Sequence, residues 1–379
     1  MKDFYWLNSD SRTFLERGYL PAGVSPEERI KQIADYSEKI LGIKGFSKKF
    51  QSYMAKGYFS LSTPVWLNYG LDSGSSISCF GITIQDDLPD ILRALGEIGM
   101  MTSQGGGTAG YIGDLRPRGA GIANRGASGG PVHFLEGFQS VTSVITQGEA
   151  RRGHFAAYMP VDHPDIYEFL NCRTEGHPIQ TLSTAVCIPE GWMDSMIEGD
   201  KEKRALWAKI LQRRSETGYP YIYFDDNVNE NKPQVYKDKD MKINHSQMCS
   251  EILEYTDDEK SFTCCLSSLN LLHFDEIKKT DAVETLTYFL DSVLTDFIMK
   301  ARVKPFMEKA VKFAVEHRSI GIGVLGWHSY LQSRMIPFES LEANMLNTSI
   351  FKFIDDRSLA ASRELAREFG EPKMLKGYG

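Results

Sequence analysis

A chain of 379 residues, 42% of them hydrophobic and 25% charged, has the composition of a globular protein and can bury one large core or two ordinary ones. Its formal charge of −7 argues against an extended nucleic-acid-binding surface. No apolar run approaches the roughly 18 residues of a membrane span, and the N-terminus is not a signal peptide, so we expect a cytoplasmic protein that binds neither membrane nor nucleic acid.

Residues 1–60 are predicted to be helical. Ser25 is a typical helix N-cap, Pro26 suits the first helical position and Glu28 completes a capping box. Gly42 ends this helix. A strand is predicted to begin at residues 63–67.

Residues 77–84 are predicted to form a strand whose two sides differ in size. One side carries Phe80 and Ile82, whereas the other carries Cys79 and Gly81. The small residues on the cysteine side indicate that another group must approach the strand there.

Loops and helices alternate through the rest of the chain. Amphipathic helices are predicted at 88–101 and 134–145, and residues 104–130 and 147–153 have loop composition, rich in glycine and arginine. The later predicted elements are a strand at 184–188, a helix at 203–217, a polar connector at 224–240, short apolar stretches at 248–255 and 262–272, and helices at 281–300, 304–316 and 350–369. The pattern predicts a mixed α/β fold.

Six cysteines lie at positions 79, 172, 187, 249, 264 and 265. They are too few for a disulfide scaffold in so long a chain, and none has the spacing of a zinc site, so no metal site is predicted.

Cys249 and Glu251 are two residues apart, and in an extended segment their side chains would project to the same side. A thiol and a carboxylate placed in this way could act on neighbouring atoms of one substrate. A buried cysteine followed by a surface glutamate is the alternative. The adjacent Cys264 and Cys265 would face opposite ways on a strand, so one of them could join Cys79 or Cys249, or both could be packing residues.

Five short motifs follow one another along the chain: Thr63-Pro64, Ser78-Cys79-Phe80, Cys249-x-Glu251-Ile252, Cys264-x-Leu266-Ser267-x-x-Asn270-Leu271, and Arg318-Ser319-Ile320-Gly321-Ile322-Gly323-Val324. Their order resembles that in the catalytic, or large, subunits of ribonucleotide reductases. The resemblance covers nearly the whole chain from residue 60 onward.

This resemblance implies an α/β barrel of ten strands, made of two five-stranded halves. A finger loop around residues 246–252 would pass through the middle of the barrel. The implied domains are an N-terminal helical region at 1–60 and an incomplete catalytic barrel at 61–379, whose C-terminal part is missing.

The resemblance also implies the chemistry of a ribonucleoside-diphosphate reductase, an oxidoreductase that makes deoxyribonucleotides. Cys249 would be the thiyl radical that abstracts the 3′ hydrogen of the ribose, and Glu251 would accept the 3′-hydroxyl proton. Cys79 and Cys264 would protonate the departing 2′-hydroxyl and finish as a disulfide. The family commonly has asparagine where this chain has Gln247, whose amide reaches one methylene further.

Candidate nucleotide contacts follow from the same resemblance. The substrate would be held by Thr63, Ser78, Gly107, Arg151 (or Arg152) and Leu266. A nucleoside triphosphate effector, dNTP or ATP, would bind Asp86, Ser103 and Arg116, and the loops at 103–130 and 147–153 would transmit its identity to the active site. The two amphipathic helices could form a homodimer interface or belong to an ordinary core.

Partners are implied as well. We expect no cofactor bound directly to this chain, a radical supplied by a separate metal-containing small subunit, and thioredoxin or glutaredoxin as reductant. The region before Thr63 is too short for the N-terminal cone domain of many relatives, so no dATP off-switch of that kind is expected. Activity is expected to need a complementing C-terminal part of the large subunit.

Two other functions remain open at this point. The first is an adenosylcobalamin-dependent reductase, although the proline and glycine that usually flank its radical cysteine are absent here. The second is a nucleotide-binding fragment that is inactive alone. A glycyl-radical reductase is disfavoured because the Cys79 and Cys264 pair would have no role in it.

Overall fold

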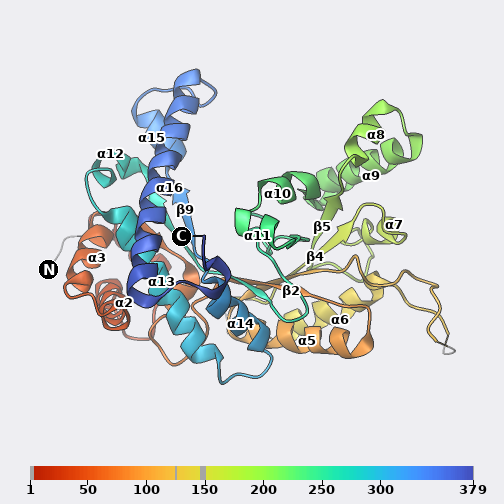
Figure 1. Cartoon of the computed structure of the whole chain (residues 1–379), viewed down its shortest axis with the longest axis horizontal. Helices are drawn as coiled ribbons and strands as arrows, with labels where there is room; N and C mark the ends of the chain where they lie inside the picture. Colours follow the sequence, from red (N-terminus) through yellow and green to blue (C-terminus); the bar gives the residue numbers. More distant parts are fainter. Residues whose placement is uncertain (1–3, 124–125, 146–150, 379) are drawn as a thin grey trace. The chain divides into compact units, whose positions relative to one another are not determined.

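The computed structural model describes residues 4–123, 126–145 and 151–378 (Figure 1). The chain divides into two compact units. Unit 1 comprises Met1–Ser78, Cys264–Arg302 and Ala314–Gly379, and unit 2 comprises Cys79–Thr263 and Val303–Phe313.

Unit 2 is built on a six-stranded sheet in which β2 to β6 are parallel. The strand order is β6-β5-β4-β3-β2-β7, with β2 Cys79–Thr83, β3 Gly107–Tyr111, β4 Phe155–Pro160, β5 Ser183–Ile188, β6 Tyr221–Phe224 and β7 Phe262–Cys264. Two helices, α5 Leu88–Ser103 and α6 Pro131–Val144, lie side by side against β2, β3 and β4 (Figure 1). The other helices are α7 Ile166–Phe169, α8 Trp192–Glu198, α9 Lys201–Thr217, α10 Asp225–Asn231 and α11 Gln234–Asp238.

The middle strands of this sheet are buried on both faces, as parallel strands usually are. Every residue of β5 is buried, and in β4 only Pro160 at the end is partly exposed. Gly81 on β2 has no room for a side chain, because a Cβ atom there would lie 2.0 Å from the ring of Phe262. The small side of β2 that the sequence predicted is therefore occupied in part by an aromatic ring from β7.

Several predicted elements of unit 2 are confirmed, and two segments differ. The strand at 77–84, the helices at 88–101 and 134–145, the strand at 184–188 and the helix at 203–217 correspond to β2, α5, α6, β5 and α9. The segment 104–130, predicted as loop, contains β3, a strand that is buried except for Tyr111 at its end and whose glycine-rich composition is typical of a loop. The connector at 224–240 contains the short helices α10 and α11, which are too short for a clear apolar period.

Unit 1 combines helices with a three-stranded sheet in the order β1-β8-β9. β1 (Phe59–Leu61) pairs antiparallel with β8 (Leu266–Asn270), and β8 pairs parallel with β9 (Gly321–Leu325). The helices are α1 Ser9–Glu16, α2 Pro26–Leu41, α3 Phe46–Ala55, α4 Thr63–Asn68, α12 Phe274–Ile277, α13 Ala282–Ala301, α15 Trp327–Ser333 and α16 Leu341–Phe369, and α14 Glu308–His317 has residues in both units.

The predicted N-cap, first-turn proline and glycine stop of α2 are confirmed, since the Ser25 hydroxyl accepts the Glu28 N–H at 3.2 Å, Pro26 begins the helix and Gly42 ends it in the left-handed region. The prediction of a strand at 63–67 is wrong, because Pro64 occupies the first turn of α4, where its fixed φ and missing N–H are tolerated. The last helix begins at Leu341, earlier than predicted, after a capping bond from the Ala343 N–H to the Ser340 hydroxyl.

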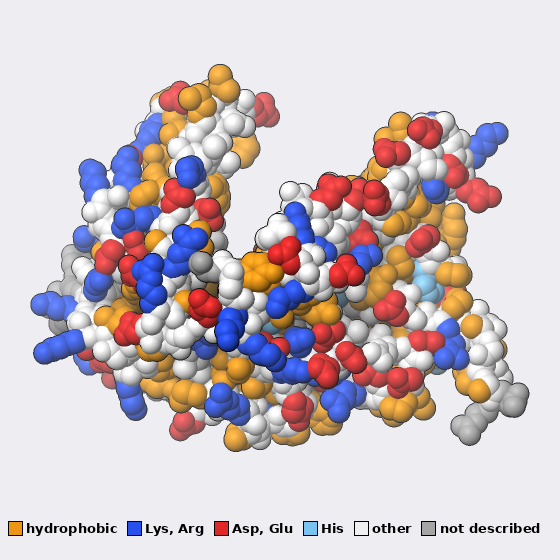
Figure 2. Space-filling model, in the orientation of Figure 1, with side chains coloured by type: hydrophobic (Ala, Val, Ile, Leu, Met, Phe, Trp, Pro, Cys, Tyr) orange, Lys and Arg blue, Asp and Glu red, His pale blue; other side chains and the backbone are white. Residues whose placement is uncertain are grey.

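The α/β class is confirmed, whereas the described residues form two open sheets of six and three strands and not a closed ten-stranded barrel. Among the helices of the described residues, none is long and apolar enough to cross a membrane. On the face shown in Figure 2, acidic and basic side chains are interspersed.

The buried Arg29 of α2 fixes the position of α4. Its guanidinium donates to the carbonyl oxygens of Val65 (3.2 Å), Trp66 (2.8 Å) and Tyr69 (2.8 Å) at the C-terminal end of α4, where helical carbonyls begin to run out of intrahelical donors. Burial lowers the pKa of Arg29 to about 10, although the nearby Asp296 opposes this shift. One side chain therefore holds the helix that begins with Thr63.

We predict that Arg29→Met lowers the free energy of unfolding by about 2–4 kcal/mol, because three buried carbonyl groups lose their donor. Urea denaturation measures the change. Arg363→Met on the exposed surface of α16 is the matched control and should change stability by less than about 0.5 kcal/mol. Equal effects of the two substitutions would contradict the role assigned to Arg29.

Candidate active site

Two cysteines of unit 2, far apart in the sequence, meet at the beginning of the parallel sheet. Cys79 is the first residue of β2 and pairs in register with Gly107, the first residue of β3. A Cβ atom at Gly107 would lie 3.0 Å from the Met248 sulfur and 3.6 Å from the Cys79 sulfur. Because Gly107 has no side chain, the Met248 side chain can occupy the space beside it.

Cys249 is exposed, whereas the other five cysteines are buried. A hydrogen bond from the Cys79 thiol lowers the pKa of Cys249; burial and the charge of Glu251 oppose this, and the charge of Arg151 assists it. Because the thiolate is the reactive form of cysteine, the lowered pKa and the exposure of Cys249 favour reaction at this thiol. Two of the three predicted sulfur atoms are thus together.

The segment 241–261 has neither helix nor strand, and Cys249 lies at the tip of a tight loop within it. We call residues 246–252 the cysteine loop. The expected extended geometry between Cys249 and Glu251 is wrong, because Ser250 has a φ of 70° and its N–H donates to the Gln247 carbonyl at 3.2 Å. Glu251 is exposed next to the thiol and acts on it by its charge.

Gln247 is completely buried at the base of this loop. Its Oε1 accepts hydrogen bonds from the Ile252 N–H (2.8 Å) and the Ser246 hydroxyl (2.7 Å). Its Nε2 has no hydrogen-bond partner within the described part of the chain. The amide carbonyl therefore stabilises the loop, whereas the amide donor is buried without a partner among the described residues.

Cys264 belongs to unit 1, so its meeting with the other two sulfur atoms stays a prediction. Its carbonyl accepts the N–H of Ser78 at 3.2 Å, and Ser78 directly precedes Cys79 in the chain. The neighbouring Cys265 is buried and its thiol faces the Leu290 carbonyl at 3.5 Å, as expected for adjacent residues that point to opposite sides.

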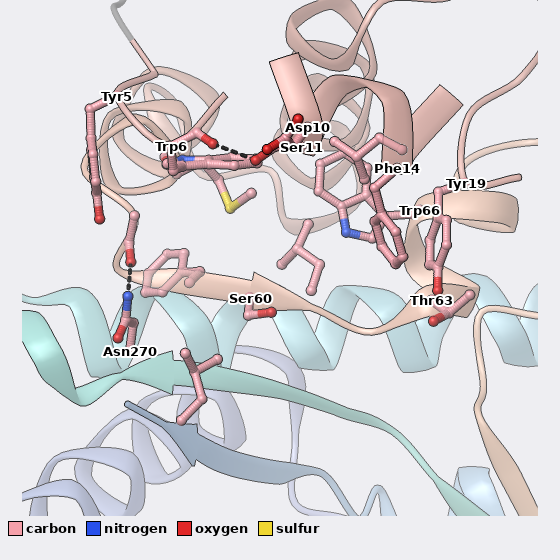
Figure 3. A pocket seen from close by; sticks show the side chains of 16 residues that line it. Tyr5, Trp6, Asp10, Ser11, Phe14, Tyr19, Ser60, Thr63, Trp66 and Asn270 are labelled. Atoms are coloured by element: carbon pink, nitrogen blue, oxygen red, sulfur yellow. Dashed lines mark hydrogen bonds between the residues drawn. The ribbon is translucent and has the colours of Figure 1, made fainter. Parts of the chain in front are cut away.

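Thr63, a predicted substrate contact, lines a cavity of about 670 Å³ within unit 1 (Figure 3). Aromatic side chains make up much of its wall, among them Trp6, Phe14, Tyr19 and Trp66. Of the remaining predicted contacts, Ser78 is buried in unit 1, Leu266 is half-buried at the start of β8, and Gly107 and Arg151 lie in unit 2 beside the two cysteines.

Other polar residues of the sequence motifs have structural contacts within unit 1. The Ser267 hydroxyl accepts the Ser62 N–H at 3.4 Å, and the Asn270 amide donates to the Gly57 carbonyl at 3.1 Å. Arg318 donates to Asp291 and Thr295 of α13, both at 2.7 Å. These residues hold β1, β8 and α13 together.

Of the predicted effector residues, Asp86 and Arg116 form an ion pair with 2.7 Å between Nε and Oδ2, and the Arg116 N–H also donates to Asp86. Ser103 is not with them. Its hydroxyl bonds the Met100 carbonyl at the last turn of α5, whereas Asp86 precedes the first turn. A 16-residue helix separates them by about 24 Å at 1.5 Å per residue. Ser103 and Arg116 of one chain cannot hold the same phosphate group.

Both predicted effector loops lie partly outside the described residues. In the loop at 147–153, residues 147–150 are not described, and in the loop at 103–130, residues 124–125 are not described. Among the residues that are described, no cluster of three or more His, Cys, Asp or Glu side chains could hold a metal ion.

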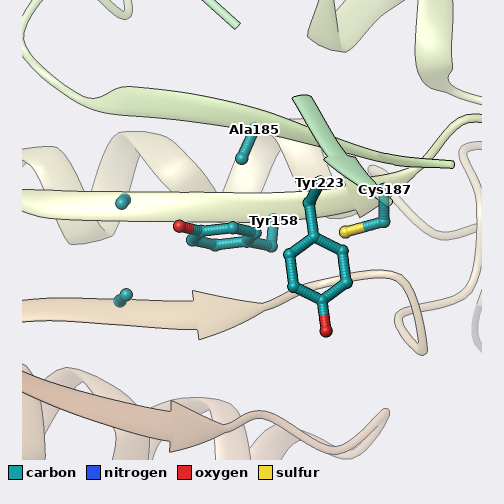
Figure 4. Packing of buried hydrophobic residues seen from close by; sticks show 6 residues of the cluster. Tyr158, Ala185, Cys187 and Tyr223 are labelled. Atoms are coloured by element: carbon teal, nitrogen blue, oxygen red, sulfur yellow. The ribbon is translucent and has the colours of Figure 1, made fainter. Parts of the chain in front are cut away.

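The sequence analysis did not identify the residues of the sheet that support the cysteine loop. Tyr158 of β4 is buried and its hydroxyl donates to the Gln247 carbonyl at 2.7 Å. Tyr223 of β6 packs near it, and its hydroxyl donates to the Ile243 carbonyl at 2.8 Å (Figure 4). A tyrosine in a strand that is otherwise apolar was the available signal, since a buried hydroxyl needs a partner.

His245 is also completely buried in this support, between the rings of Tyr158 and Phe262 at 5.6 and 5.4 Å. Its Nδ1 lies 2.8 Å from the Ser246 carbonyl. Burial lowers the pKa of His245 to about 4, so the imidazole is neutral near neutral pH.

Comparison with known proteins identifies the family. The profile of the family described as "Ribonucleotide reductase, barrel domain" matches residues 77–204 and 200–378. A putative ribonucleoside-diphosphate reductase large subunit of Frog virus 3 is 36% identical over 364 residues, covering 90% of this chain and 63% of that protein. The large subunit of Invertebrate iridescent virus 3 is 28% identical over 431 residues, covering 94% and 66%. The chain thus spans about two thirds of the length of these relatives.

A solved structure is also similar over the whole chain. It is the alpha subunit of the class Id ribonucleotide reductase of Actinobacillus ureae, with a TM-score of 0.96 and 51% sequence identity. The match covers 100% of this chain and 71% of that one.

We predict that iodoacetamide alkylates Cys249 with a pH midpoint below that of an ordinary thiol, and that Cys79→Ala moves the midpoint upward because the hydrogen bond to the thiolate is lost. Peptide mass spectrometry at a series of pH values measures the midpoint. Cys172→Ala, which removes a buried thiol elsewhere in unit 2, should leave it unchanged. An unshifted midpoint in Cys79→Ala would contradict the sulfur contact.

We predict that His245 makes stability depend on acid. The folded-state pKa of about 4 lies below the unfolded value of about 6.5, so the unfolded chain binds a proton that the folded chain does not. This stabilisation is fully present above pH 6.5 and is lost as pH falls to about 4, a total of about 3 kcal/mol.

Denaturant titrations of the wild type and His245→Gln between pH 4 and 7 measure this contribution. The variant should lose part of the acid dependence, whereas His133→Gln on the exposed surface of α6 should retain it. Identical pH slopes in wild type and His245→Gln would show that the imidazole is not buried as described.

Proposed function

Because the chain belongs to the ribonucleotide reductase family, we propose that it is the catalytic part of a large subunit that reduces ribonucleoside diphosphates to deoxyribonucleotides. The observation that carries this proposal is the exposed Cys249 thiol at the tip of a tight loop, within hydrogen-bonding reach of the Cys79 thiol. A fragment that only binds nucleotides would not need two sulfur atoms in contact.

The proposed reaction uses three sulfur atoms and one carboxylate. Cys249, as a thiyl radical, takes the 3′ hydrogen of the ribose and later returns it. Glu251 accepts the 3′-hydroxyl proton. Of the two protons of the Cys79 and Cys264 thiols, one leaves with the 2′-hydroxyl as water and the other, with the two electrons released as the thiols become a disulfide, provides the hydrogen that C2′ gains. Glu251 returns its proton to the 3′ oxygen when Cys249 returns the 3′ hydrogen.

Contacts around the cysteine loop support these roles. The exposed Glu251 carboxylate is close enough to affect the pKa of Cys249. The unpartnered Nε2 of Gln247 can donate to a substrate oxygen beside the thiol. Within unit 1 the Ser78 N–H donates to the Cys264 carbonyl at 3.2 Å, and Ser78 directly precedes Cys79 in the chain, which supports the proposed pairing of the two cysteines.

Substrate and effector contacts remain proposals. Thr63, Ser78, Gly107, Arg151 and Leu266 are the proposed substrate residues, and the loop at 147–153 is the proposed link between the effector and the substrate. The ion pair between Asp86 and Arg116 supports an effector site there, because a bound triphosphate would compete for the arginine. Ser103 could contact an effector only at a point separate from Asp86 and Arg116, because it lies at the other end of α5.

We propose the same partners that the family resemblance implies. A metal-containing small subunit supplies the radical, thioredoxin or glutaredoxin reduces the disulfide, and the part of the large subunit that the relatives have beyond this match completes the ten-stranded barrel. The similarity to a class Id alpha subunit favours this arrangement over adenosylcobalamin. A homodimer through α5 is supported by the exposed Leu88 and Leu92, whose exposed fractions are 61% and 56%.

The test is a deoxyribonucleotide assay in which the chain is combined with the remaining part of the Actinobacillus ureae alpha subunit, candidate radical-generating subunits and a dithiol. We predict dCDP formation from CDP, none with Cys249→Ala, and normal formation with Cys172→Ala. The chain alone should be inactive.

The cysteine pair is checked in the same experiment. After a single turnover without reductant, peptide mapping should find a disulfide between Cys79 and Cys264 and a free Cys249 thiol. Turnover by Cys249→Ala, or a disulfide between Cys79 and Cys249, would overturn the proposed mechanism.

A further inference from the structure

The cysteine loop has a buried base and an exposed tip. His245, Ser246 and Gln247 are completely buried, whereas Cys249 and Glu251 are exposed. An exposed tip without regular secondary structure is mobile unless its base is fixed. The side chains that fix the base therefore determine where the Cys249 sulfur lies.

Both oxygen atoms of Gln247 close this loop. The side-chain Oε1 accepts the Ile252 N–H at 2.8 Å, and the main-chain carbonyl accepts the Ser250 N–H at 3.2 Å. Flipping the amide would bring its NH₂ group against the Ile252 N–H, two donors facing each other, so the orientation is determined by this contact. Gln247 thus joins the two ends of the loop across Cys249.

Ser246 reinforces the same closure. Its hydroxyl lies 2.6 Å from the Ile252 carbonyl and 2.7 Å from Gln247 Oε1. The single hydroxyl hydrogen is shared between these two acceptors or alternates between them. The main-chain N–H and the main-chain carbonyl of Ile252 are consequently both held by side chains from the other end of the loop.

Tyr158 connects the closed loop to the sheet. Its hydroxyl donates to the Gln247 carbonyl at 2.7 Å, and its ring is buried among β4, β5 and β6 residues. Neither Tyr158 nor Ser246 belongs to the motifs of the family resemblance. A strand in the core of the sheet therefore holds the base of the loop directly.

We propose that Tyr158, Ser246 and Gln247 form a clamp that closes the cysteine loop and positions its tip thiol beside β2. In the clamp they are positioning residues, which act on the reaction through Cys249, and Gln247 takes part in it through its oxygen atoms and not through the Nε2 proposed above as a donor to substrate. The importance of the clamp for turnover rests on the proposed function, but its existence is tested by thiol reactivity in the chain itself.

The experiment measures the pH midpoint and the high-pH plateau of Cys249 alkylation in Tyr158→Phe and Gln247→Leu. A loosened loop loses the hydrogen bond from Cys79, so the midpoint moves upward, as it does in Cys79→Ala, and alkylation at pH 7 becomes several-fold slower. The plateau stays equal or rises because the tip is at least as accessible. Tyr223→Phe is the matched control, since the same atom is removed from the same cluster but its acceptor, Ile243, lies outside the loop.

Gln247→Asn tests whether the length of the side chain matters in addition to its amide group. The amide is retained but is one methylene shorter and no longer reaches Ile252, so the variant should behave as Gln247→Leu does. Alkylation of the buried cysteines, counted by mass, identifies a variant that has unfolded, and Ser246→Ala then provides a milder test of the same contact.

The proposal is overturned if Tyr158→Phe and Gln247→Leu, both folded, keep the wild-type midpoint while Cys79→Ala shifts it, or if Tyr223→Phe shifts it equally. A clamp confirmed by alkylation in a chain that makes no deoxyribonucleotide would leave the clamp standing and refute the proposed function.

Discussion

The central constraint in this protein is the space above the first residues of two neighbouring parallel strands. Gly107 leaves that space free, and the Met248 side chain fills it so closely that even a methyl group would lie 3.0 Å from its sulfur. Because Met248 is held there, the next residue, Cys249, comes within hydrogen-bonding reach of Cys79. A single absent side chain on β3 thus allows two segments distant in sequence to form one site.

In this site the supporting side chains are buried and the Cys249 thiol is exposed, as a reactive sulfur atom requires. The support under the loop is aromatic and buried, and its imidazole, His245, is kept neutral by burial. The exposed tip carries the thiol, whose pKa is lowered chiefly by another thiol and not by a fixed cation. A neutral donor of this kind stabilises the thiolate without adding a permanent charge to the site.

Much of this organisation could be predicted from the sequence. The small side of β2, the capped helix α2 and the pairing of a thiol with a carboxylate at Cys249 and Glu251 rest on local patterns, and the family resemblance followed from motif order. What local patterns could not reveal was geometry that depends on tertiary contacts. The strand β3 was hidden by its glycines, α4 was mistaken for a strand because its apolar run is short, and the turn at Ser250 required a positive φ that serine seldom adopts.

The support of the loop was missed for the same reason. Tyr158 and Ser246 are unremarkable in sequence, and only their bonds to the backbone of Gln247 and Ile252 give them a role. Ser103 shows the opposite situation: it is near Arg116 in sequence, yet it lies at the far end of α5 from Asp86 in space.

The pairing of strands also has a consequence for how the protein acquires its fold. β2 to β6 pair in sequence order, whereas Phe59 of β1 pairs with Leu269 of β8, more than 200 residues later in the chain. The two sulfur atoms of the site are also far apart in sequence, because Cys79 begins β2 and Cys249 follows β6. Contacts between residues so far apart close long loops and form slowly. During synthesis Cys79 leaves the ribosome well before its sulfur partner exists, so the thiol pair is assembled only after most of unit 2 has been made.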